Sequence, residues 1–266
     1  MRGGHGRRAA PRSRCGGRLI VSAFAAALAV LMLPAGAARA QQPLRPVEFL
    51  TCHYVEGKGP ADLDGLEAAF NDWMRTQEAP PYSAYVLTPR AYTRDVDFDF
   101  AWIGAWPSGV AMGQSMAHYF AEGAALAPVF DSVMRCDSNV QFAVLTLRPP
   151  ADSGRFGPLE VADCTLRVGA RVDAALEAVA EWIEYFVRSG SSAGHWILFP
   201  AYGERGDAGY SFKWATGHES YEAFGRDYDE FYNGGGVDRF AELLDPLLRC
   251  DTPRLYSVRP IRVEAE

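Results

Sequence analysis

Apolar and polar residues change their spacing along this chain in the same order twice. In two segments the apolar residues recur at steps of three or four, which predicts amphipathic helices. They are Leu63, Leu66, Phe70 and Trp73 in the first segment, and Val172, Leu176, Val179, Ile183 and Phe186 in the second. Stretches rich in aromatic and β-branched residues surround both helices and predict strands. These strands cover about 47–54, 82–92, 98–106 and 140–148, then 159–167, 195–202, 210–218 and 255–262.

A second helix is predicted in each half, after the third strand. It begins at Ser108 and at Ser220, and a serine hydroxyl there can accept a hydrogen bond from a free amide of the first turn. Both helices are interrupted by glycine, at Gly123 in the first half and at 234–236 in the second. Each half therefore has the order βαββαβ.

Matching residues support an internal repeat. Cys52 and Cys136 correspond to Cys164 and Cys250, and other matching signals recur at offsets of 110 to 114 residues. We predict an α+β protein made of two tandem ferredoxin-like βαββαβ repeats, packed sheet to sheet as an internal α/β-barrel pseudo-dimer. The first repeat covers 41–150 and the second covers 151–266, with a linker rich in Pro and Gly at 149–154.

A family resemblance rests on the third strands and the helices that follow them. The stretch Trp102–Ser108 leads into a helix that breaks after Tyr119-Phe120, and Trp214–Ser220 repeats this before Phe231-Tyr232. These segments resemble the dimeric α/β-barrel superfamily. That superfamily includes antibiotic-biosynthesis monooxygenase-like proteins, NIPSNAP proteins, and the haem-binding chlorite-dismutase and dye-decolorising-peroxidase branches. The stretch Cys164–Gly169 is also similar to the first strand and turn of NIPSNAP-type domains.

The N-terminal 40 residues have the order of a secretory signal. Arginines precede an apolar run at 19–33, and Ala38-Arg39-Ala40 follows as a cleavage site. We expect the mature chain to begin at Gln41 and to be periplasmic or secreted. The apolar run is shorter than the roughly 20 residues of a spanning helix, so no membrane association is expected after cleavage.

Charge argues against one class of partner. The first 40 residues hold seven of the 26 basic residues and none of the 33 acidic residues, which leaves the mature chain with a net charge of −14. Binding to phosphate backbones depends on clustered positive charge. Nucleic acid is therefore excluded as a partner, and we expect a monomer because each half supplies a partner for the other.

Four cysteines allow three pairings. In an antiparallel βαββαβ sheet the last strand lies beside the first, so we favour one disulfide inside each repeat, Cys52–Cys136 and Cys164–Cys250. An exported protein meets the oxidising conditions that such bonds need. Because the chain lacks Cys-x-x-Cys spacing, we predict no metal site.

An asymmetry between the repeats marks a candidate ligand site. Trp214 and His218 share one face of the third strand of the second repeat, and Tyr228 lies on the facing helix. The corresponding residues of the first repeat are Trp102, Trp106 and Met116, which are apolar. We therefore predict a ligand-binding pocket in the second repeat, with His218 as the candidate catalytic residue. It consists of Tyr202, Trp214, His218 and Tyr228.

Strand parity sets a second group of polar residues between the two sheets: His53, Asp99, Asp163 and Lys213. The favoured interpretation is an ion-pair network, and the alternative is a ligand-binding lumen.

The sequence favours an exported protein that binds a small apolar or aromatic molecule, with no cofactor. Three alternatives stay open. The resemblance implies a cofactor-independent monooxygenase with His218 as base, or a haem-binding barrel. The third is a structural or interaction protein whose pockets are filled by its own side chains.

Overall fold

A computed structural model of the protein describes residues 43–94, 96–204 and 209–264. The predicted signal peptide lies outside the described residues. Residues Gln41–Glu266 form one compact unit, and the boundary predicted between residues 150 and 151 stays a prediction.

Both halves contain the predicted order of elements. The first half comprises β1 (Arg45–Tyr54), η1 (Pro60–Asp62), α1 (Leu63–Thr76), β2 (Ser83–Ala91), β3 (Phe100–Ala105), α2 (Gly109–Glu122), η2 (Gly123–Ala125), α3 (Ala127–Asp131) and β4 (Met134–Arg148). The second half comprises β5 (Pro158–Leu166), α4 (Val172–Arg188), β6 (Gly194–Tyr202), β7 (Phe212–Gly217), α5 (Tyr221–Asn233), α6 (Gly236–Leu243), β8 (Leu248–Cys250) and β9 (Arg254–Arg262).

The strands close into an antiparallel barrel. Their order is β7-β6-β4-β1-β3-β2-β9-β5, and β5 also pairs with β7, which completes the ring. The short β8 pairs with β5 beside the position of β9. The pairings β4–β6 and β2–β9 join the two halves. The predicted α+β class and the ferredoxin-like barrel are therefore confirmed.

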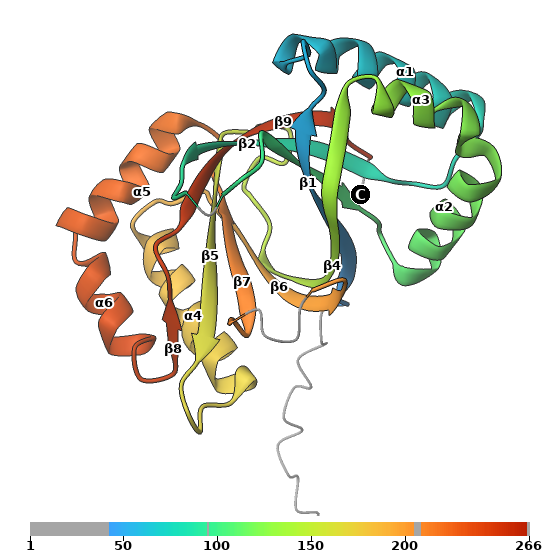
Figure 1. Cartoon of the computed structure of the whole chain (residues 1–266). Helices are drawn as coiled ribbons and strands as arrows, with labels where there is room; N and C mark the ends of the chain where they lie inside the picture. Colours follow the sequence, from blue (N-terminus) through green and yellow to red (C-terminus); the bar gives the residue numbers. More distant parts are fainter. Residues whose placement is uncertain (1–42, 95, 205–208, 265–266) are drawn as a thin grey trace, which may run out of the picture. The chain divides into compact units, whose positions relative to one another are not determined.

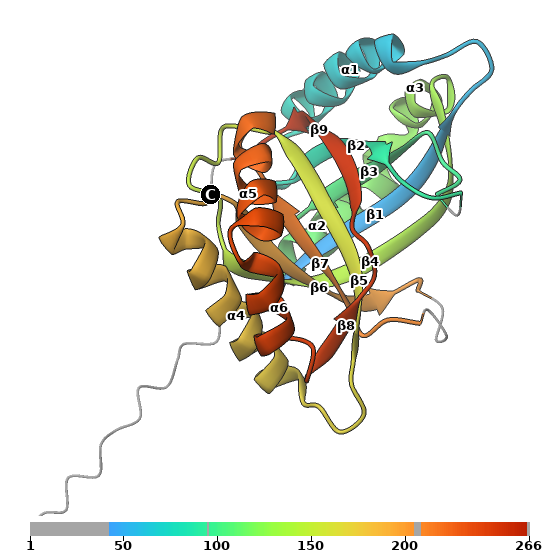
Figure 2. The same ribbon diagram turned by 90° about the vertical axis from the view of Figure 1, so that its left-hand side faces the viewer.

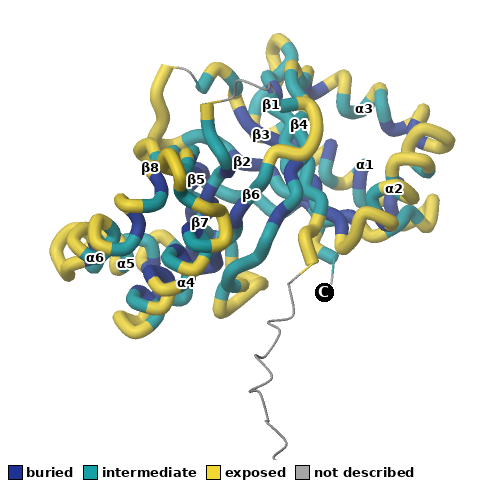
Figure 3. The backbone as a smooth tube through the Cα atoms, turned by 90° about the horizontal axis from the view of Figure 1, so that it is seen from below, coloured by how far each residue is buried: buried dark blue, intermediate teal, exposed yellow. Residues whose placement is uncertain are grey.

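Helices cover the outside of the barrel on two sides (Figure 1). Helices α1, α2 and α3 lie against the strands of the first half, while α4, α5 and α6 lie against those of the second (Figure 2). Buried residues lie where the helices meet the strands, and the outer helix faces are exposed (Figure 3).

Three apolar clusters follow from this arrangement. One lies under the helices of the first half and includes Phe70 and Trp102, and a second lies under those of the second half and includes Trp182 and Trp214. The third combines residues from strands of both halves and fills the barrel interior: Leu87, Ala101, Val161, Ala215 and Tyr256. Because the strand side chains alternate, each strand contributes to one outer cluster and to the interior.

The predicted starts and breaks of the second helices are present. The hydroxyls of Ser108 and Ser220 accept hydrogen bonds from the amides of Ala111 and Ala223, both at 3.1 Å. At the second break Gly235 has φ of 103°, a backbone conformation that favours glycine.

Both predicted disulfides are present in the structure. Cys52 is bonded to Cys136, and Cys164 is bonded to Cys250. Each bond joins directly paired positions of neighbouring strands, β1 with β4 and β5 with β8. Among the described residues, no helix combines the length and the apolar character needed to cross a membrane.

Candidate functional site

The candidate site is a charged cluster around a buried histidine, under the helices of the second half. His218, one residue beyond β7, is only 4% exposed. Its Nε2 lies 3.0 Å from the carboxylate of Glu160 on β5. Its Nδ1 lies 3.2 Å from the carboxylate of Asp227 on α5. One imidazole is thus held between carboxylates from a strand and from a helix.

The two carboxylates determine the charge of His218. Burial alone would lower its pKa, but the hydrogen bonds and negative charges of Asp227 and Glu160 outweigh burial and raise the pKa to about 9. At neutral pH the ring is therefore an imidazolium, which can donate a proton and has no free position to accept one.

A short loop before β6 supports the cluster. The hydroxyl of Ser191 donates to Asp227 at 2.7 Å. Arg148, at the end of β4, donates to the backbone carbonyls of Ser191 at 3.1 Å and of Ala193 at 2.9 Å. The loop that carries Ser191 is consequently fixed to the end of a strand from the first half.

A second histidine, His195 on β6, lies in the same region and is only 2% exposed. Its Nδ1 accepts a hydrogen bond from the indole of Trp214 at 3.4 Å and lies 3.2 Å from the hydroxyl of Thr216. Burial lowers its pKa to about 3, and the positive charges of His218 and Arg148 act in the same direction. The site thus contains one charged and one neutral imidazole.

The first half has different residues at the strand positions that correspond to this site. Strand register places Glu48 where the second half has Glu160, Gly104 where it has Thr216, and Ala84 where it has His195. The phenol of Tyr82, which is buried, donates to Glu48 at 2.6 Å and accepts a hydrogen bond from the indole of Trp102 at 2.8 Å.

Tyr82 takes up the space beside Gly104. A Cβ at residue 104 would lie 2.0 Å from the Tyr82 hydroxyl, so only glycine fits there. Burial raises the pKa of Glu48, although hydrogen bonds from Tyr82 and Asn139 oppose this. Both halves therefore retain a glutamate under the helices, but a tyrosine is its partner in one half and a histidine in the other.

The four predicted ligand-binding residues differ in burial and in position. Trp214 and His218 are both buried under the helices, and His195 lies beside them through its contact with Trp214. Tyr228 is 52% exposed on α5 and reaches His218 only through Phe224, whose ring lies 5.3 Å from the imidazole. Tyr202 is 68% exposed at the end of β6. The structure does not bring these four side chains together.

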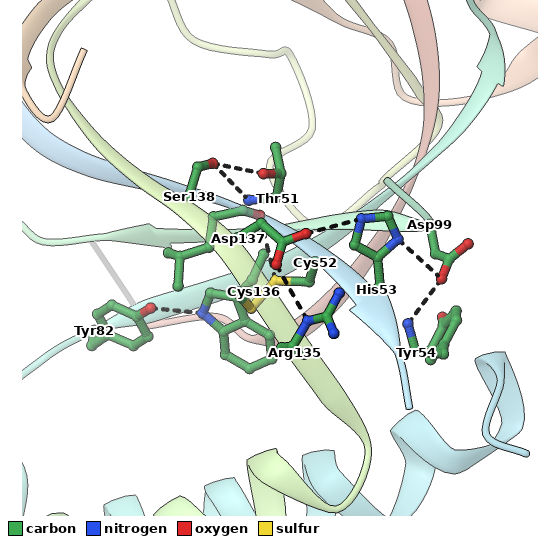
Figure 4. Close-up of a disulfide and its surroundings, with 12 residues drawn as sticks. Thr51, Cys52, His53, Tyr54, Tyr82, Asp99, Arg135, Cys136, Asp137 and Ser138 are labelled. Atoms are coloured by element: carbon green, nitrogen blue, oxygen red, sulfur yellow. Dashed lines mark hydrogen bonds and ion pairs between the residues drawn. A yellow bond between two sulfur atoms is a disulfide. The ribbon is translucent and has the colours of Figure 1, made fainter. Parts of the chain in front are cut away.

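The four predicted inter-sheet residues fall into two clusters. In the first half, Nε2 of His53 lies 3.2 Å from Asp137 and its Nδ1 lies 3.8 Å from Asp99, next to the Cys52–Cys136 disulfide (Figure 4).

In the second half, Lys213 pairs with Asp163 at 2.6 Å, and its ammonium group lies 4.0 Å from the ring centre of Tyr210. Arg254 joins this cluster through ion pairs to Asp163 at 3.3 Å and to Asp251 at 3.1 Å.

Two open surface pockets occur at corresponding places near the disulfides. One, of about 400 Å³, is lined by Asp163, Arg167, Arg249 and neighbouring residues. The other, of about 450 Å³, is lined by His53, Glu56, Arg135 and neighbouring residues. Neither pocket is lined by His218. Among the described residues, no group of His, Cys, Asp and Glu side chains could hold a metal ion.

Sequence reasoning did not find the carboxylate partners of His218. Glu160 has the same strand parity as Cys164, so its position under the helices could have been read from alternation along β5. Asp227 and Ser191 gave no such signal, because their contacts depend on how a helix and a loop pack over the sheet.

The comparisons with known proteins concern the fold. Neither a family model nor a curated protein matches the sequence of this chain. The chain is similar to the chlorite dismutase of Candidatus Nitrospira defluvii solved with imidazole, with a TM-score of 0.51 at 10% identity over 83% of this chain and 93% of that one. A haem-binding protein from Thermus thermophilus gives 0.44 at 10% identity, over 81% and 91%. An anthrone oxidase-like protein gives 0.43 at 15% identity, over 83% and 94%.

The similarity to the chlorite dismutase and the closed sheet place the fold among the ferredoxin-type α/β barrels with a closed antiparallel sheet. A haem-binding barrel, which the sequence left open, would need a histidine nitrogen free to bind the iron and space for the ring under the helices of the second half. Both nitrogens of His218 face carboxylates. Around His195 the space is filled by aromatic rings, with Trp214 at 6.1 Å and Trp182 at 6.3 Å between ring centres. These residues do not fit a haem macrocycle.

Proposed function

We propose that this chain is an exported protein that binds a small apolar or aromatic molecule under the helices of its second half, beside His218. The observation that carries the proposal is the buried imidazole of His218, held between the carboxylates of Glu160 and Asp227. Its counterpart at Trp106 in the first half is an indole with no ionisable group. A protein that needed only a filled core could use the same apolar solution in both halves.

Energetics support a role beyond packing. The buried imidazolium of His218 loses its hydration, as do in part the side chains of Asp227, 16% exposed, and Glu160, 31% exposed. Replacing such a group by apolar residues often leaves a protein equally or more stable. The first half already shows an apolar residue that fits at this position, since Trp106 is buried. The cluster is therefore better explained by the binding of a ligand than by stability.

The protonation state of His218 limits the reactions in which this side chain can take part. With a pKa of about 9, His218 is charged at neutral pH, and both of its nitrogens face carboxylates, so it contributes a fixed positive charge rather than a free hydrogen-bond donor. Use of His218 as a base, which the monooxygenase alternative needs, would require alkaline conditions. The ring of Phe224, whose centre lies 5.3 Å from that of the imidazole, suits an apolar or aromatic body.

Export is supported by the order of residues 1–40 and by the two disulfides, which are compatible with an extracellular protein. The intact mass of the exported protein should correspond to a chain that begins at Gln41. A mass that still includes residues 1–40 would contradict this part of the proposal.

Binding can be tested by a thermal-shift screen of apolar and aromatic compounds. We expect compounds that raise the melting temperature of the wild type and of Trp106→Phe, the matched change in the first half, but not of His218→Gln. Quenching of Trp214 fluorescence by the same compounds would place them beside the site. If no compound acts, or if both variants respond alike, the second half has a core filled by its own side chains.

A further inference from the structure

The pocket next to the Cys164–Cys250 disulfide is open to solvent and has a volume of about 400 Å³. Every second side chain of β5 points away from the helices, and these side chains change in character along the strand. Val161 belongs to the apolar cluster of the barrel interior, whereas Asp163 and Thr165 line the pocket. The pocket therefore lies on the interior side of β5, where the apolar cluster ends.

Two arginines line this pocket from neighbouring segments of the sheet. Arg249 on β8 lies opposite Thr165 on β5, and the amide of Arg167 donates to the carbonyl of Leu247 at 2.9 Å. Arg167 and Arg249 are thus diagonal neighbours on one face, where long side chains can reach the same small ligand. The Nε of Arg167 donates to the carbonyl of Asp245 at 3.0 Å. In the part of the chain that the structure describes, neither guanidinium forms an ion pair with a carboxylate.

Two carboxylates also line the pocket, but both already have cationic partners. Asp163 pairs with Lys213 at 2.6 Å and with Arg254 at 3.3 Å, and Asp251 pairs with Arg254 at 3.1 Å. Within this group two negative charges balance two positive charges. The charges of the two arginines are therefore left over, on a mature chain whose net charge is −14. A local positive field of this kind attracts small anions.

The corresponding pocket of the first half lacks this positive charge. Counted from the matching cysteines of the first strands, Val55 stands at the position of Arg167. The one arginine that lines the pocket of the first half, Arg135, pairs with Asp137 at 3.3 Å, and Glu56 adds a negative charge. The arginine pair is therefore particular to the second half and does not follow from the fold that the halves share.

We propose that Arg167 and Arg249 bind the carboxylate of a small organic acid, whose apolar part lies against Leu166 and Val168. A guanidinium matches a carboxylate through two parallel N–H···O bonds, which a neutral group of the same shape cannot form equally well. Leu166 and Val168 line the same pocket, and the side chain of Val168 is fully exposed. The volume is in the range of small-ligand sites. This site is separate from the one proposed beside His218, which does not line the pocket.

Benzoate and benzamide are a matched pair of probes, because they share a ring and a similar shape but only benzoate is charged at neutral pH. In ¹⁵N-labelled protein the amide resonances of Arg167 and Val168 should move on addition of benzoate. We expect an affinity about tenfold above that for benzamide, the preference that a charged hydrogen bond supports. High salt should reduce this preference, since exposed charges are screened. Equal affinities for the two probes, or no movement of these resonances, would overturn the proposal.

Exposed arginines can be replaced with little risk to folding, which the melting temperature of each variant checks. Arg167→Gln and Arg249→Gln should each remove most of the preference for benzoate. Arg135→Gln is the matched change beside the other disulfide and should bind benzoate as the wild type does. His218→Gln should also keep this binding, so the result does not depend on the proposed function. A loss in Arg135→Gln or in His218→Gln as large as that in Arg167→Gln would contradict the assignment of the site.

Discussion

At the scale of single residues, the two halves differ in the side chain that pairs with a glutamate under the helices. Each has a glutamate under its helices, Glu48 or Glu160, whose carboxylate is paired with a buried side chain. The first half uses the hydroxyl of Tyr82 for this purpose. The second uses His218 and adds Asp227, which turns a neutral contact into a charged network. The difference makes the second half sensitive to pH.

The raised pKa of His218 predicts a loss of stability at alkaline pH. The folded protein holds a proton that the unfolded chain releases near its ordinary pKa of about 6.5, so the stabilisation is complete below that pH and is lost as the pH rises through about 9. The free energy of unfolding, measured with urea, should fall by on the order of 3 kcal/mol across this window. His218→Gln should flatten the curve between these pH values, whereas Trp106→Phe should keep it. A flat wild-type curve would show that the histidine is not held as an imidazolium.

His195 predicts the opposite dependence on the acid side. Its pKa is lowered to about 3, so the folded protein excludes a proton that the unfolded chain takes up below about 6.5. Stability should therefore decline as the pH falls from 6.5 towards 3. His195→Phe should reduce this decline in the same urea titrations, and an unchanged decline would assign it to the carboxylates alone.

At the scale of elements, local signals and strand pairing account for most of what was predicted. Serine starts α2 and α5, glycine ends them, and alternation along the strands divides their side chains between the helix side and the interior. The disulfides lie at paired positions because the last strand of each half runs beside the first. These features depend on residues close in sequence or on one rule of strand order.

The capping serines provide a test at this scale. Ser108→Ala and Ser220→Ala each remove one hydrogen bond to a free amide of the first helical turn, at no change in charge. Each should lower the free energy of unfolding by about 1 kcal/mol. Ser153→Ala in an exposed turn is the control and should have no measurable effect. Losses equal to that control would mean that packing alone sets where these helices begin.

Each disulfide should contribute similarly, since the sequence separations are 84 and 86 residues. Replacing Cys52 and Cys136 together by serine, or Cys164 and Cys250 together, should cost about 4 kcal/mol in the chain-entropy model. Peptide mapping without reductant should recover each pair as one linked peptide. A Cys52–Cys164 link would contradict the pairing.

At the scale of the whole molecule, the barrel makes the halves dependent on each other. Strand β4 pairs with β6 and β2 pairs with β9, so neither half keeps its edge strands exposed. The interior cluster also takes residues from both halves, and neither half could bury them alone. We therefore expect the two halves to unfold together as a single unit.

Single-step unfolding is the corresponding prediction. Calorimetry of the protein from residue 41 should give one transition with matching calorimetric and van't Hoff enthalpies. Trp106→Ala, which opens a cavity in the first half, should cost about 3–5 kcal/mol. It should also lower the melting temperature of the whole unit. Two separate transitions, only one of which moves in this variant, would show that the halves fold independently.

The sequence by itself determined the order of elements, the helix starts, the disulfide pairs and the likeness of the two halves. All of these follow from periodic spacing, local hydrogen bonding or position within a strand. It also indicated His218 as the residue that differs from its counterpart. Only the tertiary structure decided what surrounds His218, because Glu160, Asp227 and His195 come from three elements far apart in sequence. It likewise placed Tyr202 and Tyr228 at the surface, since the direction of a side chain at a strand end or on a helix depends on what packs against it.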